Sequence, residues 1–228
     1  MEIKKRLFLY AFILTLVLFI GLVLLNRFMD DHREQFIENG LQDVVNNANE
    51  LQTMLLMGDV YGEKMTCLIF SEKLKKLDKS VWTLGLKIDE YRVASQDFLE
   101  NPWYLEQKTI FNQQEVLYLS LLKRSKQKCG FTTPIILFFY QNSDDCKKCD
   151  DQSFVLGDIN RKAGTEVSIF SFDIDRNLTT VNLLKNFYDI TELPCLVIED
   201  KKYCGMQDNA MILSTLCQNA TISLCPKQ

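Results

Sequence analysis

The chain has 228 residues, a net charge of −4 and one histidine, His32. This length accommodates one or two folded domains, and the slightly acidic balance argues against a nucleic-acid partner. A single histidine also argues against a histidine-based catalytic triad or metal site. The eight cysteines indicate metal binding or catalysis in the cytosol and disulfides outside it, so the N-terminus decides between these interpretations.

The first element is an unbroken apolar run over residues 7–25, LFLYAFILTLVLFIGLVLL. At about 1.5 Å per residue, a helix of this length just crosses a hydrocarbon core of about 30 Å. Lys4, Lys5 and Arg6 precede the run, which predicts a single-pass signal-anchor with residues 1–27 forming a cytoplasmic tip and the membrane helix. The alternative is a cleaved signal peptide, although no small-residue cleavage site follows. Both interpretations place the remainder in the extracytoplasmic space.

Residues 28–126 are expected to form a helical spacer. After an interruption at 58–62, apolar residues from Cys67 to Tyr91 recur at alternating spacings of three and four. This alternation is typical of a coiled-coil seam and predicts a stalk able to associate with itself. Asn101-Pro102 breaks the helix, because proline disfavours helical geometry at the residue before it, and a third helix is expected to end near Lys126.

The break near residue 100 also predicts a disulfide. Two helices joined by a short turn lie antiparallel, which brings Cys67 opposite Cys129. A bond between them would close the open end of the helical hairpin. The alternative is two unpaired thiols, with Cys67 as a small apolar residue in the seam.

From residue 130 the pattern changes to that of a small α/β domain, expected at 130–218, with a tail at 219–228. A continuous apolar run at 134–140 indicates a central strand buried on both faces. The other expected elements are helices at 149–163 and 181–188, strands at 166–173 and 195–199, a hairpin turn at Asp200-Lys201, and a last helix capped by Asp208 or Asn209 that runs through Cys217. The order β-α-β-α-β-β-α makes the first two strands parallel and the last two a hairpin.

A pair of cysteines, Cys146-Lys147-Lys148-Cys149, follows the first strand, and Leu193-Pro194 opens the third. This combination, with Gly205 closing the hairpin, resembles the thioredoxin superfamily over residues 130–218. The resemblance implies a thioredoxin-like fold and thiol–disulfide exchange, in which Cys146 attacks and Cys149 resolves the mixed disulfide. It further implies a cis bond at Leu193-Pro194 that shapes a substrate groove. Electrons would pass to or from a partner protein in the membrane or outside the cytoplasm, with no small-molecule cofactor.

The dithiol departs from the family pattern in its neighbours. Asp145 replaces the usual aromatic, Lys147-Lys148 replaces the usual Gly-Pro or Pro-His, and the central strand has no buried carboxylate. A helix N-terminus and two lysines favour the thiolate, which is the attacking species. Four aspartates oppose it, namely Asp144, Asp145, Asp150 and Asp151. We therefore expect a moderate or reducing pair rather than a strongly oxidising one.

The sequence thus favours a membrane-anchored extracytoplasmic oxidoreductase that acts on protein thiols and disulfides. Two other interpretations of Cys146 and Cys149 stay open. The pair could be a structural disulfide in a redox-inactive scaffold or interaction protein. It could also bind a metal with the neighbouring aspartates, although tetrahedral zinc sites usually recruit four nitrogen or sulfur ligands.

The remaining cysteines lie near the C-terminus. Cys217 and Cys225 enclose a short loop and are expected to form a disulfide. A turn at 200–201 places Cys204 opposite Val197, so a Cys195–Cys204 bond would need a shifted register, and buried free thiols are the alternative. Two N-glycosylation patterns, at 177–179 and 219–221, are compatible with an exported domain.

Overall fold

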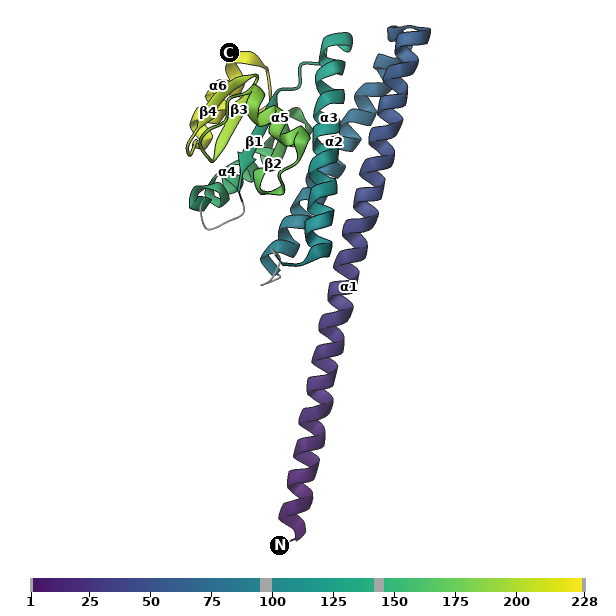
Figure 1. Ribbon diagram of the computed structural model, residues 1–228, viewed down its shortest axis with the longest axis vertical. Helices are drawn as coiled ribbons and strands as arrows, with labels where there is room; N and C mark the ends of the chain where they lie inside the picture. Colours follow the sequence, from purple (N-terminus) through teal and green to yellow (C-terminus); the bar gives the residue numbers. More distant parts are fainter. Residues whose placement is uncertain (1, 95–99, 142–145, 227–228) are drawn as a thin grey trace. The chain divides into compact units, whose positions relative to one another are not determined.

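The computed structural model describes residues 2–94, 100–141 and 146–226 (Figure 1). The chain forms two compact units, Met1–Asn39 and Gly40–Gln228, and the helix α1 (Glu2–Tyr61) contributes to both. Among the described helices, α1 alone is long and apolar enough to be a membrane anchor or a signal sequence. An 18-residue window near its N-terminus has a mean hydropathy of 2.9, and none of that window is buried.

The second unit contains a small mixed sheet with helices. Its elements after α1 are α2 (Glu63–Ala94), α3 (Pro102–Cys129), β1 (Ile135–Tyr140), α4 (Lys147–Ala163), η2 (Gly164–Glu166), β2 (Ser168–Asp173), η3 (Ile174–Arg176), α5 (Thr179–Phe187), β3 (Cys195–Ile198), β4 (Lys201–Cys204) and α6 (Asn209–Asn219). The strand order is β2-β1-β3-β4. β1 and β2 are parallel and β3 and β4 are antiparallel, as the element order predicted, and β3 is also antiparallel to β1.

The central strand β1 is buried on both faces. On one face, Ile136 and Phe138 of β1 belong to a core cluster with residues of α4 and α6. On the other face, the Phe139 ring lies 5.5 Å from the ring of Phe172 in β2. A continuous apolar strand is expected in such a position, because neither face meets water.

Local signals at both ends define α3. The Asn101 side chain accepts a hydrogen bond from the Tyr104 backbone N–H at 3.2 Å, and Pro102 occupies the first helical turn. At the other end Gly130 has a φ of 69° and donates its N–H to the Lys126 carbonyl. The helix therefore ends at Cys129 rather than near Lys126, because the left-handed glycine comes after three further residues.

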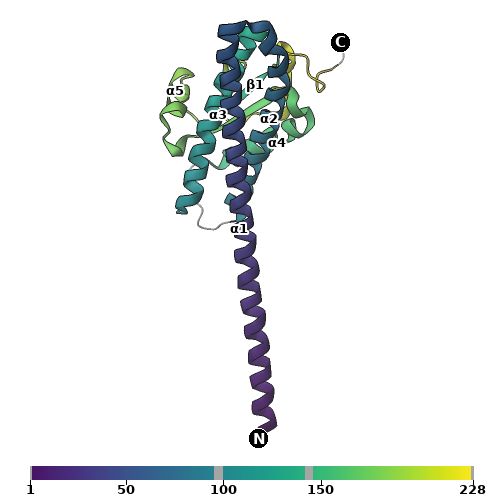
Figure 2. The same cartoon turned by 90° about the vertical axis from the view of Figure 1, so that its right-hand side faces the viewer.

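The heptad residues of α2 are buried inside this unit. Phe70, Leu77 and Ile88 are fully buried, and Tyr118 of α3 packs its ring 5.2 Å from Phe170 of β2. In Figure 2, α2 and α3 lie beside the strands. The helices and the sheet thus belong to one compact unit, whereas the sequence suggested a boundary between residues 126 and 130. Alternating spacings of three and four serve a coiled-coil seam and a globular helix face equally well, so the pattern alone did not separate them.

Side chains of α3 occupy the free edge of the sheet. The backbone N–H of Ser171 donates to Glu115 Oε1 at 2.9 Å, and that of Asp173 donates to Asn112 Oδ1 at 3.1 Å. Asn112 Nδ2 in turn donates to the Ser171 carbonyl at 3.3 Å. β2 is an edge strand, so these contacts satisfy backbone groups that another strand would otherwise pair.

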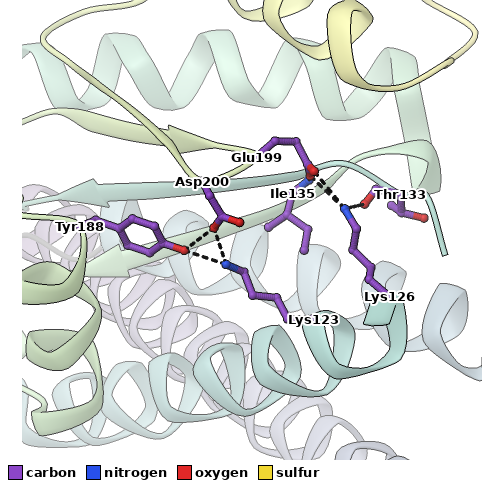
Figure 3. A network of polar contacts seen from close by, with 7 residues as sticks. All are labelled: Lys123, Lys126, Thr133, Ile135, Tyr188, Glu199 and Asp200. Carbon is purple, nitrogen blue, oxygen red and sulfur yellow. Dashed lines mark hydrogen bonds and ion pairs between the residues drawn. The ribbon is translucent and has the colours of Figure 1, made fainter. Parts of the chain in front are cut away.

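A second polar network joins the C-terminal half of α3 to the sheet (Figure 3). Lys126 Nζ donates to the Thr133 carbonyl at 2.9 Å and to Glu199 Oε1 at 3.0 Å. Glu199 Oε1 also accepts the Ile135 backbone N–H at 2.7 Å. One turn earlier on α3, Lys123 Nζ donates to Asp200 Oδ1 at 2.6 Å. The helix is therefore tied to the start of β1 and to the β3–β4 turn.

Candidate functional site

The cysteines of the predicted dithiol lie at the N-terminal end of α4. Cys146 is the N-cap residue and Cys149 lies in the first turn, with 5.4 Å between their Cα atoms and a disulfide between their sulfurs. Cys146 is 8% exposed and Cys149 is 2% exposed. This position places the sulfurs beside the unpaired backbone N–H groups of the helix, which favour a thiolate when the bond is reduced.

Charged side chains surround the dithiol. Lys147 and Lys148 are exposed between the two cysteines, and Asp150 and Asp151 are exposed immediately after them. Arg92 of α2 donates from Nη2 to Asp150 Oδ1 at 3.4 Å, so one of these aspartates has a cationic neighbour. The other two aspartates considered in the sequence, residues 144 and 145, lie outside the described residues.

The predicted groove residues Leu193 and Pro194 immediately precede β3. Leu193 packs against the core cluster that contains both cysteines. The Leu193–Pro194 peptide bond is cis, and the Pro194 carbonyl accepts the Gly205 backbone N–H at 2.8 Å. Leu193 therefore borders the apolar cluster to which the cysteine pair also belongs.

The other six cysteines form three disulfides. The structure joins Cys67 to Cys129 and Cys217 to Cys225, with Cα separations of 5.5 Å and 5.6 Å. Cys195 and Cys204 are also bonded, and their Cα atoms lie 4.0 Å apart. No free cysteine is present in the described chain.

The register at Cys204 differs from the sequence prediction. Cys195 pairs directly with Cys204, so the prediction that Cys204 lies opposite Val197 was wrong. The turn consists of Glu199 and Asp200, with φ values of 45° and 67°, rather than of residues 200–201. A two-residue hairpin of this kind requires positive φ at both positions, usually marked by Asn-Gly or Asp-Gly, and Glu-Asp carries no such signal.

Sequence reasoning missed a cavity of about 100 Å³ that Cys149 lines. Its wall includes Trp82 of α2, Lys108 and Glu115 of α3, and Tyr140 of β1. These residues were overlooked because α2 and α3 were treated as a spacer. The sequence did contain a sign of buried polar residues on α3. Lys108, Asn112 and Glu115 recur at spacings of four and three, so they share the helix face that also carries the apolar residue Phe111.

Burial controls the ionisation of both charged residues in this cavity. Desolvation raises the pKa of Glu115 to about 8, although hydrogen bonds from the Ser171 backbone and the Asn112 side chain and the nearby charge of Lys108 act in the opposite direction. Desolvation likewise lowers the pKa of Lys108, against the attraction of Asp173 and Glu115. The cavity therefore places two groups with shifted pKa values beside the second cysteine.

Within the described ranges, no three residues among His, Cys, Asp and Glu lie close enough together to hold a metal ion. The aspartates at 144 and 145, which a metal site at the cysteine pair could recruit, lie outside those ranges.

No protein-family model matches the sequence, and comparison with curated proteins finds no match. Among solved structures, the chain is similar to a malarial protein, with 16% identity and a TM-score of 0.34 over 39% of this chain and 99% of that one. It is also similar to thioredoxin-2, a component of the malaria parasite protein secretion machinery, with 16% identity and a TM-score of 0.33 over 38% of this chain and 82% of that one. At these TM-scores the likeness extends to part of the chain and carries no information about its chemistry.

Proposed function

We propose that this chain is a membrane-anchored, thioredoxin-like thiol–disulfide oxidoreductase that acts on protein disulfides outside the cytoplasm. The observation that carries the proposal is the position of Cys146 and Cys149 at the start of α4, with Leu193 packed against the same cluster. A cysteine pair at a helix N-terminus has the local field that favours a reactive thiolate.

Cys146 is the attacking residue, because it is the more exposed of the two. Its thiolate attacks one sulfur of a partner disulfide, which breaks that bond, forms a mixed disulfide and releases one partner thiolate. Cys149 then attacks the Cys146 sulfur, forms the internal disulfide and releases the second partner thiolate. The partner gains two electrons that the cysteine pair loses, and the reverse sequence oxidises a partner dithiol.

The apolar segment of α1 supports the location. A window of 18 residues with mean hydropathy 2.9 is sufficient for a membrane anchor. The three positive residues before it favour a cytoplasmic N-terminus, which puts the cysteine pair in an oxidising compartment.

Two cysteine variants test the proposal. In full-length protein, Cys146→Ser should abolish the reduction of insulin disulfides, and Cys149→Ser should accumulate mixed disulfides that cannot be resolved. The double variant Cys217→Ser/Cys225→Ser, which lacks a different disulfide, should retain turnover. The proposal would be rejected if Cys146→Ser still reduced insulin and Cys149→Ser formed no mixed disulfides.

A redox-inactive scaffold is the second candidate, and the deep burial of both cysteines favours it. A structural disulfide typically has a reduction potential below about −300 mV, whereas exchange enzymes lie above it. Thiol labelling of the full chain across graded glutathione buffers measures this potential. A value below that limit for the Cys146–Cys149 bond would favour the scaffold.

A further inference from the structure

The cavity beside Cys149 has mostly apolar walls and is open to a small ligand. Trp82, Phe111, Phe138 and Tyr140 contribute aromatic rings, and the cavity measures about 100 Å³. This is roughly two-thirds of the 150 Å³ or so of an apolar protein cavity that binds benzene. The space therefore suits a group of a few heavy atoms rather than a ring.

Lys108 brings a positive charge into this apolar space. The residue is 7% exposed, and its Nζ lies 5.3 Å from the centroid of the Tyr140 ring and 6.0 Å from that of Phe111. In the described part of the chain, its ammonium group has no hydrogen-bond acceptor or ion-pair partner. Lys108 Nζ is not among the fully buried unpartnered atoms of the described residues, so it is accessible from the cavity. An ammonium group has three donors, and a ligand that supplies an oxygen would form a charge-assisted hydrogen bond with it.

Glu115, an acid in the cavity wall, already has partners for both oxygens. Its Oε1 accepts the Ser171 backbone N–H and its Oε2 accepts Asn112 Nδ2, each at 2.9 Å. Both carboxylate oxygens of Glu115 are therefore occupied by other donors, and the described contacts of Glu115 include no ion pair with Lys108.

The remaining acids nearby are paired with arginines. Asp89 lies 2.7 Å and Asp150 lies 3.4 Å from guanidinium nitrogens of Arg92 at the cavity wall. Asp173 lies 3.9 Å from Arg176 and also accepts the Asp175 backbone N–H. Lys108 forms no ion pair within 4.0 Å with a described residue, and Asp173 is the acid whose charge attracts it most.

We propose that this cavity binds a carboxylate of the exchanging thiol or disulfide, with the Lys108 ammonium as its ion-pair partner. The identity of the ligand as an exchange substrate rests on the function proposed above, whereas binding of a carboxylate does not. The carboxylate positions the substrate and takes no part in the transfer of electrons. Its source is either a small acidic thiol or an acidic side chain beside a polypeptide cysteine.

Reduction rates test the site in oxidised full-length protein in detergent micelles. The measured quantity is the rate at which 3-mercaptopropionate reduces the Cys146–Cys149 bond, divided by the rate for its methyl ester. We expect this ratio to be about tenfold higher in the wild-type chain than in Lys108→Met, which is the size of effect expected for a hydrogen bond to a charged group. Lys148→Met removes an exposed lysine from the same turn and should keep the preference. A preference that persists in Lys108→Met, or disappears in Lys148→Met, would overturn the proposal.

Peptide disulfides distinguish the two sources. If the carboxylate comes from a polypeptide, a Glu beside the substrate cysteine should be preferred over Gln, and Lys108→Met should remove that preference. If it comes from a small thiol, only 3-mercaptopropionate should show the effect. Absence of the preference in both assays contradicts the site.

Propionate gives a measurement that needs neither a folded variant nor turnover. It should shift the indole resonance of Trp82 saturably in the wild-type chain and slow reduction by 3-mercaptopropionate but not by the methyl ester. Propionate binding in a chain whose disulfide resists every thiol would reject the exchange function and leave the site standing. Exchange with no propionate effect would reject the site and leave the function standing.

Discussion

Asp78 is a single carboxylate buried where three elements meet. Tyr118 of α3 donates its hydroxyl to Asp78 Oδ1 at 3.1 Å, and Ser168 of β2 also hydrogen-bonds to this carboxylate. Desolvation outweighs these contacts and raises the pKa of Asp78 from 3.8 to about 6. The folded chain therefore binds more protons at Asp78 than the unfolded chain between these two values.

This shift predicts a pH dependence of stability. Since the folded state holds the extra proton, the contribution of Asp78 is fully present below about pH 4 and is lost as the pH rises through 6. Asp78→Asn should remove this slope and stabilise the chain at pH 7.5 by up to about 3 kcal/mol. Urea unfolding of both proteins from pH 4.5 to 8 checks the prediction, and parallel curves for the two proteins would contradict it.

Asn112 provides a second prediction for a single side chain. Its Oδ1 accepts the buried N–H of Asp173 at 3.1 Å, so Asn112→Ala leaves that donor unsatisfied. We expect a loss of about 2 kcal/mol in the free energy of unfolding and faster hydrogen exchange at the Asp173 amide. The exposed neighbour Gln113→Ala should change neither quantity appreciably. Unchanged exchange at Asp173 in Asn112→Ala would show that α3 does not protect this edge.

At the scale of elements, the helical hairpin is closed by a long-range disulfide. Cys67 and Cys129 are separated by 62 residues in sequence, whereas Cys217 and Cys225 are separated by 8. Because a longer closed loop removes more entropy from the unfolded chain, loss of the first bond should cost about 4 kcal/mol and loss of the second about 2.5 kcal/mol.

Paired alanine substitutions measure this difference. Cys67→Ala/Cys129→Ala and Cys217→Ala/Cys225→Ala each remove one bond without leaving a free thiol. Urea unfolding under non-reducing conditions should give the larger loss for the first pair. If the first pair cost no more free energy of unfolding than the second, the length of the loop that the Cys67–Cys129 bond closes would not determine its effect on the unfolded chain.

The helical hairpin also marks where sequence reasoning was sufficient and where it was not. Its antiparallel arrangement and the Cys67–Cys129 pairing followed from the break at Asn101-Pro102 alone. The packing of α2 and α3 onto the sheet did not follow, because a heptad pattern does not specify what the apolar face contacts. For the same reason, Lys108 and Glu115 could not be recognised as neighbours of Cys149.

For the whole molecule, the α/β region was the most predictable part. The apolar runs of β1 and β3 mark their positions, so the element order, the parallel β1–β2 pair and the terminal hairpin could be predicted from residues 130–218. Cys146 and Cys149 follow β1 and Leu193 precedes β3 in the chain, and all three border one core cluster. The cavity that α2 and α3 complete could not be predicted, because the sequence does not show which part of the sheet these helices contact.

The position of the chain across the membrane gives the last prediction. If residues 7–25 are a retained anchor with a cytoplasmic N-terminus, a protease added outside intact cells should digest a C-terminal epitope tag and spare an N-terminal one. Both tags should remain on one chain in the membrane fraction, whereas a cleaved signal peptide would release the C-terminal part.

Charge reversal provides the matched control for this topology. Replacement of Lys4, Lys5 and Arg6 by glutamate removes the positive residues that predict a cytoplasmic N-terminus, and should invert a fraction of the chains. The inverted chains would expose their cysteines to the reducing cytoplasm, so their disulfides should fail to form. Gel mobility with and without reductant measures this directly. Fully formed disulfides in the inverted fraction would contradict the dependence of this fold on an oxidising compartment.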